Sequence, residues 1–445
     1  MELSELTRLR VELDEFVAEY RDCVKTKPSR KHMRTYVSGL LGPLKRKNVE
    51  AIALEAGVPV RTLQEFLSLH RWDDLAVGRR TRELVRRRHS SDDAIAVIDE
   101  TSFAKKGKKT AGVKRQYCGA TGKIDNCVVS VHLGYVADQF QALLDGELFL
   151  PEEWVANPAR CAEAAVPKKA IYRPKWKIAL DLLERSLSEG VHFRWLTADE
   201  LYGRTSAFRE RVAELGLTYV VEVPCTTKGW TKRPRVEPAG LRLMRGPARS
   251  RARVARGERE CRQADSLWKR GGPSWQVFRV KDTEKGPEVW RVRETRFHPW
   301  KREGSRGIPG PKSRLVIAKN VLSQETKYFL TNAGSEIALA EVLRIAFSRA
   351  CIEQLFREAK GAVGLDEFQV RSHRSLNRHL VLTAASLLFL AEQTERLRGK
   401  KPVVERVPGA RSGRASAGPC VFATRATPTA GTSPQTPRIP AQASC

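Results

Sequence analysis

Two acidic pairs follow strand-like apolar runs in this 445-residue sequence, and carboxylates in such positions can hold metal ions. The run AIAVIDE ends in Asp99 and Glu100, and the run HFRWLTADE ends in Asp199 and Glu200. Because functional groups in open α/β sheets gather beyond the carboxyl ends of strands, we expect Asp99 and Asp199 to lie close together. Like charges at such range need a cation between them, and oxygen ligands of this kind suit Mg²⁺ or Mn²⁺.

A third carboxylate is expected on a helix packed beside these strands, and Glu353 is the candidate. A helix through RACIEQLFREAKG places Glu353 on one face with Arg349, Phe356 and Lys360. That face presents a carboxylate between two cations suited to substrate phosphates. Glu358 points elsewhere on the same helix and is the weaker choice. Taken one at a time, each of these acids is more often a solvated surface residue, and only their combination favours a metal site.

The elements that must position these acids alternate between strands and helices. Strand-like runs cover residues 94–100, 113–118, 126–137, 192–200 and 218–224, and helical periods cover 172–189 and 205–215. This order predicts an α/β domain with a mixed sheet. Residues 225–330 become strand-like and rich in turns, around a loose arginine-rich piece at 242–270. Helical periods return over 336–360 and 379–397.

The first 90 residues read as helical, and one part of them has the pattern of a helix-turn-helix. A helix ending at Gly57 is followed by a second that starts near Pro59. The second helix turns Leu63, Phe66 and Leu67 inward and Arg61, Thr62 and Gln64 outward. Two interpretations stay open, which are DNA binding by the second helix and an ordinary helical hairpin.

Composition narrows the class of protein. Eighty Lys and Arg against 51 Asp and Glu give a net charge of +29, which favours a polyanionic partner such as nucleic acid. The apolar fraction of 41% supplies a core, and no apolar run reaches the roughly 18–20 residues of a membrane span. The nine cysteines are scattered without a C-x-x-C pair, so we expect free thiols in a cytoplasmic protein.

Three blocks in a fixed order resemble insertion-sequence transposases of the DDE superfamily. The blocks are VIDETSFAKKGKKTAGVKRQYCGATGKIDN, LTADELYG, and IEQLFREAKGAVGLDEFQVRSH followed by Arg378-His379. The resemblance spans about residues 15–395 and implies an RNase H-like mixed-sheet catalytic domain with a β-rich insertion. It places the family's triad of acids on Asp99, Asp199 and Glu353. The family commonly carries a tryptophan where this sequence has Ala350.

The same resemblance implies metal-dependent cleavage at element ends and strand transfer into target DNA. It implies two divalent ions as cofactors, and double-stranded DNA as the partner, both as terminal inverted repeats and as target. A homodimer or larger assembly on DNA is expected because two DNA ends must be handled together. The alternatives are an RNase H-like nuclease without strand transfer and a decayed or domesticated transposase that retains only DNA binding.

Eight cations are candidates for DNA contact, and five segments are expected along the chain. The candidate cations are Lys105, Lys106, Lys108, Lys109, Arg349, Lys360, Arg371 and Arg378. A solvated hairpin tip is the alternative for the four lysines. The expected segments are helical DNA-binding residues 1–90, catalytic residues 91–224, the β-rich insertion 225–335, the catalytic helices 336–398 and a disordered tail 399–445.

Overall fold

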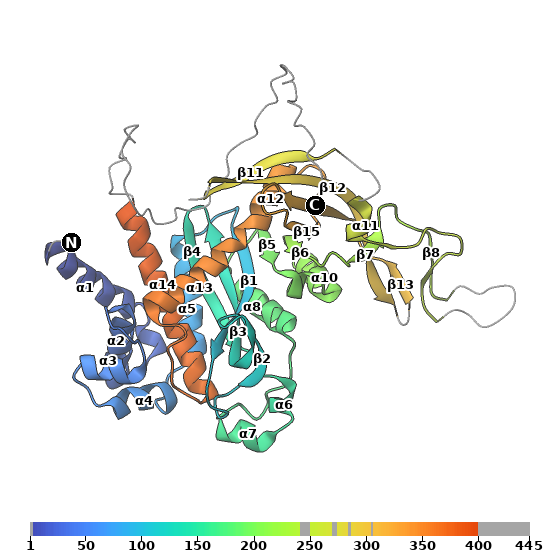
Figure 1. The fold of residues 1–445 in the computed structure, drawn as a ribbon. Helices are drawn as coiled ribbons and strands as arrows, with labels where there is room; N and C mark the ends of the chain where they lie inside the picture. Colours follow the sequence, from blue (N-terminus) through green and yellow to red (C-terminus); the bar gives the residue numbers. More distant parts are fainter. Residues whose placement is uncertain (1–2, 241–249, 269–273, 284–285, 304–305, 399–445) are drawn as a thin grey trace, which may run out of the picture.

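The structure is a computed structural model, and it describes residues 3–240, 250–268, 274–283, 286–303 and 306–398 (Figure 1). The predicted tail at 399–445 and parts of the arginine-rich piece lie outside these residues. In the N-terminal part, helices form as predicted. Their bounds are α1 Leu3–Ala18, η1 Arg21–Cys23, α2 Lys27–Leu41, α3 Val49–Glu55, α4 Val60–Ser68 and α5 Asp74–Arg88.

The helical pair predicted around Gly57 is confirmed as α3 and α4. Gly57 adopts a left-handed backbone with φ of 62°, which a side chain would disfavour, and it ends α3. Leu63, Phe66 and Leu67 are buried on α4, as the pattern indicated. DNA binding by α4 stays a prediction.

The centre of the molecule is a mixed sheet to which most of the described strands belong. Its core strands are β1 Ile95–Ala104, β2 Lys114–Cys118, β3 Lys123–Ala137, β4 Phe140–Leu148, β5 Trp195–Ala198 and β6 Thr218–Glu222. β1 pairs in parallel with β5, which pairs in parallel with β6, whereas β3 is antiparallel to both β1 and β4. The carboxyl ends of β4, β1, β5 and β6 therefore point toward one edge of the sheet.

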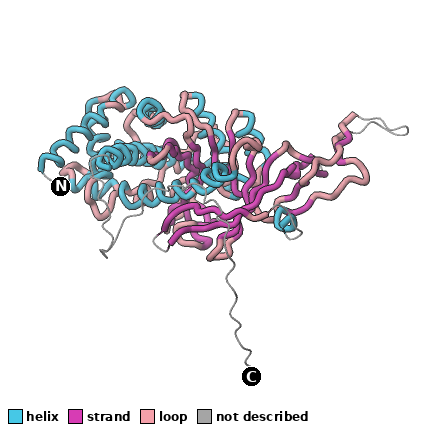
Figure 2. The backbone as a smooth tube through the Cα atoms, turned by 90° about the horizontal axis from the view of Figure 1, so that it is seen from above, coloured by secondary structure: helices cyan, strands magenta, loops and turns pink. Residues whose placement is uncertain are grey.

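The strands predicted for residues 225–330 are present, and they extend the same sheet. β15 pairs with β6, and β14 and β12 follow outward. Figure 1 shows β11, β12 and β15 on the side away from the N-terminal helices, and Figure 2 shows strands extending away from the helical end that holds the N-terminus. The elements of this region are β7 Lys228–Trp230, β8 Val236–Glu237, β9 Arg253–Val254, β10 Arg262–Gln263, α11 Ala264–Trp268, β11 Gln276–Thr283, β12 Gly286–Glu303, β13 Arg306–Pro309, β14 Ser313–Asn320 and β15 Thr326–Thr331. Of these, β8 and β9 pair with each other as a separate two-stranded sheet. The placement of domain boundaries stays a prediction.

Helices cover both faces of the core strands. One face carries α8, and the other carries α13 and α14. On the second face, Gly134 of β3 lies against Ile352 and Leu355 of α13. The bounds are α6 Glu152–Val155, α7 Pro158–Glu163, α8 Lys175–Ser188, α9 Glu200–Gly203, α10 Ser206–Glu214, α12 Leu339–Ser348, α13 Ala350–Val363 and α14 His373–Arg398. Among the described helices, including the 26-residue α14, we find no stretch with the length and apolarity of a membrane span.

The helical pattern predicted over residues 336–360 is confirmed from Leu339 onward, and it is divided into two helices at Arg349. α12 ends at Ser348 and α13 begins at Ala350, so Arg349 lies at the bend. The bend places Glu353 in the first turn of α13. α13 ends at Gly364, whose φ of 66° is left-handed.

The prediction that Arg378 contacts DNA is wrong, because this side chain is 3% exposed and bound inside the protein. Its guanidinium donates to the carbonyl oxygens of Phe66, Leu67, His70 and Trp72 at 2.7–3.2 Å. Burial lowers the pKa of Arg378 to about 10. Arg378 therefore links α14 to the end of α4 and to the residues that follow it by hydrogen bonds.

We expect Arg378→Ala to lower the free energy of unfolding by about 3 kcal/mol or more, because buried carbonyl oxygens lose their donors. Arg374→Ala is the matched control, since Arg374 lies one turn earlier on α14 and is exposed. Urea denaturation of both variants measures the difference. A fully stable Arg378→Ala protein with weakened DNA binding would contradict this structural role.

Candidate active site

Asp99 and Asp199 lie where the parallel pairing of β1 and β5 stops. The pairing ends at Ile98 and Ala198, so each acid follows directly. The prediction that the first strand ends at its acids is wrong, because β1 continues to Ala104 along β3. After β5 the chain turns into α9, and Asp199 caps this helix by accepting from the backbone N–H of Leu201 at 3.0 Å.

Burial and neighbouring carboxylates favour the protonated forms of these two acids. Burial, together with the neighbouring Asp199 carboxylate, raises the pKa of Asp99 to about 7. Burial and the charge of Glu100 raise the pKa of Asp199 to about 6. Asp99 and Asp199 therefore lie close enough to interact, and their binding of a cation stays a prediction.

Arg349 supplies positive charge to this site. Its guanidinium donates to Asp99 Oδ2 at 3.1 Å and pairs with Glu353 Oε1 at 3.0 Å. Its Nε lies 4.0 Å from Glu222 Oε2. Burial by itself lowers the pKa of Arg349, but the surrounding carboxylates raise it above its usual range. The Arg349 guanidinium is thus paired with carboxylates inside the protein. Its contact with DNA stays a prediction.

Glu353 joins the site through Arg349. Its side chain is 55% exposed, so it has room to turn, and Ala350 beside it is half-buried. Within the described ranges, no three Asp, Glu, His or Cys side chains come close enough to form a ready-made metal site. The donors nevertheless fit a hard divalent cation, because they are carboxylate oxygens and two of them follow directly on neighbouring parallel strands. The three-carboxylate site stays a prediction.

Glu100 points to the opposite face of the sheet from Asp99, as expected for its neighbour in a strand. There it accepts from the Tyr202 hydroxyl at 2.8 Å and from Lys175 Nζ at 2.7 Å. The backbone N–H of Tyr202 also lies 3.5 Å from Asp199 Oδ1, so this residue contacts both acidic segments. Neither Tyr202 nor Lys175 was predicted from the sequence.

Glu222 is a further acid of the site that was not predicted from the sequence. It is the last residue of β6, the parallel neighbour of β5, and its carboxylate lies near Arg349. The run TYVVEVP could have indicated this acid, because its apolar strand ends in Glu222 as the runs before Asp99 and Asp199 end in acids. Gly203 of α9 packs on β6 so closely that a Cβ would lie 1.9 Å from the Glu222 carbonyl oxygen.

The lysines that follow β1 differ in their surroundings. Lys105 donates to the Phe368 carbonyl at 3.0 Å, and its ammonium lies 3.6 Å from the Phe368 ring centre. The prediction of DNA contact is therefore weakened for Lys105. Lys109 pairs with Glu163, whereas Lys106 and Lys108 are exposed. Lys360 is half-buried near Phe103 and Arg371 is exposed, and their DNA contacts stay predictions.

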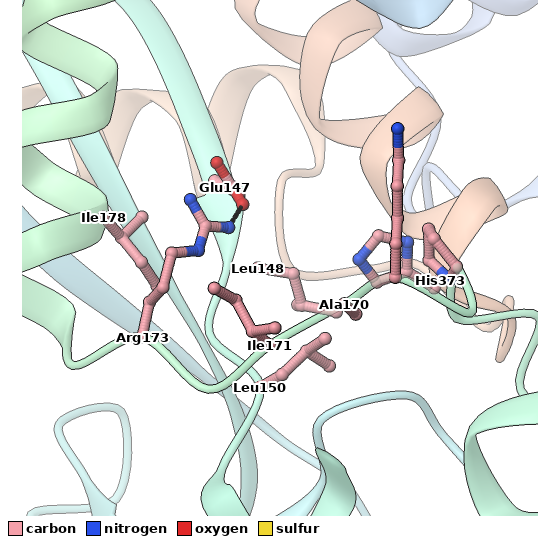
Figure 3. A pocket seen from close by; sticks show the side chains of 10 residues that line it. Glu147, Leu148, Leu150, Ala170, Ile171, Arg173, Ile178 and His373 are labelled. Carbon is pink, nitrogen blue, oxygen red and sulfur yellow. Dashed lines mark hydrogen bonds and ion pairs between the residues drawn. The ribbon is translucent and has the colours of Figure 1, made fainter. Parts of the chain in front are cut away.

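A cavity of about 400 Å³ lies apart from the acids, at the carboxyl end of β4 (Figure 3). Leu148, Leu150 and Ile171 form apolar walls, and the ion pair of Arg173 with Glu147 lies beside them. His373 lines the cavity at the start of α14, and burial lowers its pKa to about 4. None of the three predicted catalytic acids lines this cavity.

Comparison with known proteins agrees with the acidic centre. The family model for DDE superfamily endonucleases matches residues 19–287, more than half of the chain. The chain belongs to the DDE superfamily endonucleases. The matched region includes Asp99 and Asp199 and ends before Glu353.

A relative gives more detail about this endonuclease. The chain is 31% identical over 213 residues to a protein from Microchaete diplosiphon described as a probable transposase for insertion sequence element IS701. The aligned region covers 47% of the chain and 53% of that protein. The chain thus spans about half the length of this curated relative.

The raised pKa of Asp99 predicts how stability depends on pH in metal-free buffer. The native state keeps a proton that the unfolded state releases between about pH 4 and 7, so this contribution is lost as pH rises through about 7. Asn cannot ionise, so Asp99→Asn should be more stable than the wild type near pH 8, on the order of 2 kcal/mol, and not near pH 4.

Chemical denaturation in the presence of EDTA, at both of these pH values, measures this difference. Asp92→Asn is the control, because Asp92 is exposed shortly before the same strand. An equal gain for Asp99→Asn at both pH values would show that the effect is not due to ionisation.

Proposed function

We propose that this endonuclease is a DNA transposase that cleaves element ends and transfers them into target DNA with divalent metal ions. The observation that carries the proposal is that half-buried Asp99 and Asp199 follow directly on the paired ends of β1 and β5, with Arg349 linking Asp99 to Glu353. The similarity to a probable transposase supports strand transfer in addition to hydrolysis. The catalytic residues proposed are Asp99, Asp199 and Glu353.

The order of the core strands supports an RNase H-like catalytic fold. Along the sheet the strands follow as β4, β3, β1, β5 and β6, and of these five only β3 runs in the opposite direction. The first acid then lies on the central strand and the second follows its parallel neighbour. Glu353 reaches the same edge from α13, which packs on β1 and β3. These positions support the proposal that the three acids act together.

Asp99, Asp199 and Glu353 would hold two Mg²⁺ or Mn²⁺ ions. Bound there, such ions supply activation of a water or 3′-hydroxyl oxygen and stabilisation of the leaving oxygen. Asp99 and Asp199 must lose their protons to bind the cation, and Arg349 must release Glu353. The freed guanidinium would then be available to a phosphate of the DNA.

Two further parts of the proposal concern partners. The positive charge of the chain suits the phosphates of terminal inverted repeats and target DNA, and affinity should fall with salt. Joining of two ends to one target favours a homodimer or larger assembly on DNA. An RNase H-like nuclease would cut the same ends without joining them.

Substitution of the third acid gives a sharp test. We expect Glu353→Gln to reduce end cleavage at least about a hundredfold while leaving DNA affinity intact, because a metal ligand is lost. Glu358→Gln is the matched control, since Glu358 is exposed on the same helix and hydrogen-bonds to Gln354. The assay incubates full-length protein with labelled element-end DNA and Mg²⁺, then resolves nicked and joined products.

The products separate the possible functions. Nicks and joined strands from the wild type support a transposase, whereas nicks alone favour the nuclease. Binding without either product indicates a protein that retains only DNA binding. Full cleavage by Glu353→Gln would exclude Glu353 as a ligand.

A further inference from the structure

The hairpin of β2 and β3 exposes two large apolar side chains opposite each other. Tyr117 and Ile124 are directly paired across the strands and are 66% and 63% exposed. Arg115 lies two residues before Tyr117, so its exposed side chain shares this face of the ribbon. Lys123 is exposed beside the turn but lies on the opposite face, because it pairs with buried Cys118. We call Tyr117, Ile124 and Arg115 the hairpin surface.

The turn of this hairpin rests on the strand that carries Asp99. The backbone N–H of Ala120 donates to Ser102 Oγ at 3.3 Å, and Thr121 and Gly122 donate to the Cys118 carbonyl. Ser102 is three residues beyond Asp99 on β1, about 10 Å at the rise of a strand. The hairpin is therefore fixed beside the acidic centre.

The loop of lysines after β1 is fastened to the same hairpin. The side chain of Asn126 donates to the carbonyl oxygens of Lys105 at 2.6 Å and Gly107 at 2.9 Å. The N–H of Lys105 returns a hydrogen bond to the Asn126 carbonyl at 2.8 Å. Asn126 is opposite Arg115 in the ribbon. The loop thus has a defined position next to the hairpin surface.

The charges around the apolar pair are left without internal partners. In the part of the chain that the structure describes, Lys106, Lys108, Arg115 and Lys123 form no ion pair, whereas Lys114 and Lys109 pair with Glu153 and Glu163. The one acid on the hairpin strands, within the same described residues, is Asp125, which accepts from the Asn126 N–H. Exposed apolar groups within unpaired cations suit a polyanion that also offers apolar faces.

We propose that the hairpin surface enters a groove of the DNA beside the cleaved phosphodiester, with Tyr117 and Ile124 against the bases. The surrounding cations, including Lys106 and Lys108, contact the phosphates. A two-stranded ribbon fits the major groove, where exposed apolar side chains contact the base edges and the thymine methyl groups. This inference rests on the proposed function and adds a contact that positions the scissile bond.

The test compares DNA affinity of full-length variants on a labelled duplex carrying the element's terminal sequence. Tyr117→Ser should weaken DNA binding about tenfold or more, whereas Tyr117→Trp should bind DNA about as tightly as the wild type. The slope of log affinity against log salt should be unchanged in Tyr117→Ser. It should become shallower by about 0.9 for each of Lys106→Gln and Lys108→Gln, because each removes a phosphate contact.

Leu322→Ser is the matched control, because Leu322 is 79% exposed in the turn between β14 and β15. It should leave affinity unchanged, and thermal melts should show that every variant folds. A 2-aminopurine base placed within about ten base pairs of the cut should change fluorescence with the wild type and not with Tyr117→Ser.

Each outcome decides the proposal. A wild type that binds and cuts, with Tyr117→Ser equally active and equally tight, overturns the hairpin contact and leaves the proposed function standing. A Tyr117→Ser protein that loses self-association but keeps its DNA affinity shows that the surface binds protein instead. A wild type that neither binds nor cuts the duplex refutes the proposed function and this inference together.

Discussion

The structure depends on the free energy that is needed to hold ionised carboxylates close together at one edge of a sheet. Asp99 and Asp199 are forced into proximity because β1 and β5 are paired in parallel up to the preceding residues. Burial keeps water from screening them, and each raises the energy of ionising the site. Arg349 offsets part of this cost by pairing with Asp99 and Glu353. The proposed cation-binding function rests on this arrangement and not on any single residue.

The rest of the fold serves to keep these elements in place. Arg378 joins the helical part to α14, and α14 packs on β4, so the N-terminal helices have a fixed position relative to the sheet. On the face opposite Asp99, Tyr202 and Lys175 hold Glu100. Gly203 allows α9, the helix that Asp199 caps, to pack closely on β6. Rigid support of this kind is what a positioned metal site requires.

Much of this arrangement could be predicted from the sequence, because an apolar run that ends in acids is typical of a buried strand whose end reaches a polar edge of the sheet. The segments leading to Asp99 and Asp199, and the helical pair around Gly57, were predictable from periodicity alone. The triad itself rests on family resemblance, and its assembly stays a prediction. Glu222 could have been found by the same strand-end rule.

Other features of the structure could not be predicted, because no pattern in the sequence indicates them. β4 was not predicted, because the turn before it uses Asp138 at a φ of 50° where a glycine would have marked a hairpin. The bend at Arg349 lies in a continuous helical pattern without glycine or proline. Arg378 reads as a surface cation, since sequence shows its charge and not the carbonyl groups that surround it.

The most direct measurement of the central claim is metal-mediated cleavage of the protein's own backbone. Fe²⁺ takes the place of Mg²⁺ in carboxylate sites, and with ascorbate and peroxide it cuts the chain near its ligands. We predict fragments that end close to residues 99, 199 and 353, and their suppression by excess Mg²⁺. Cuts that cluster elsewhere, or that spare residue 353 while DNA is being cleaved, would contradict the three-carboxylate site.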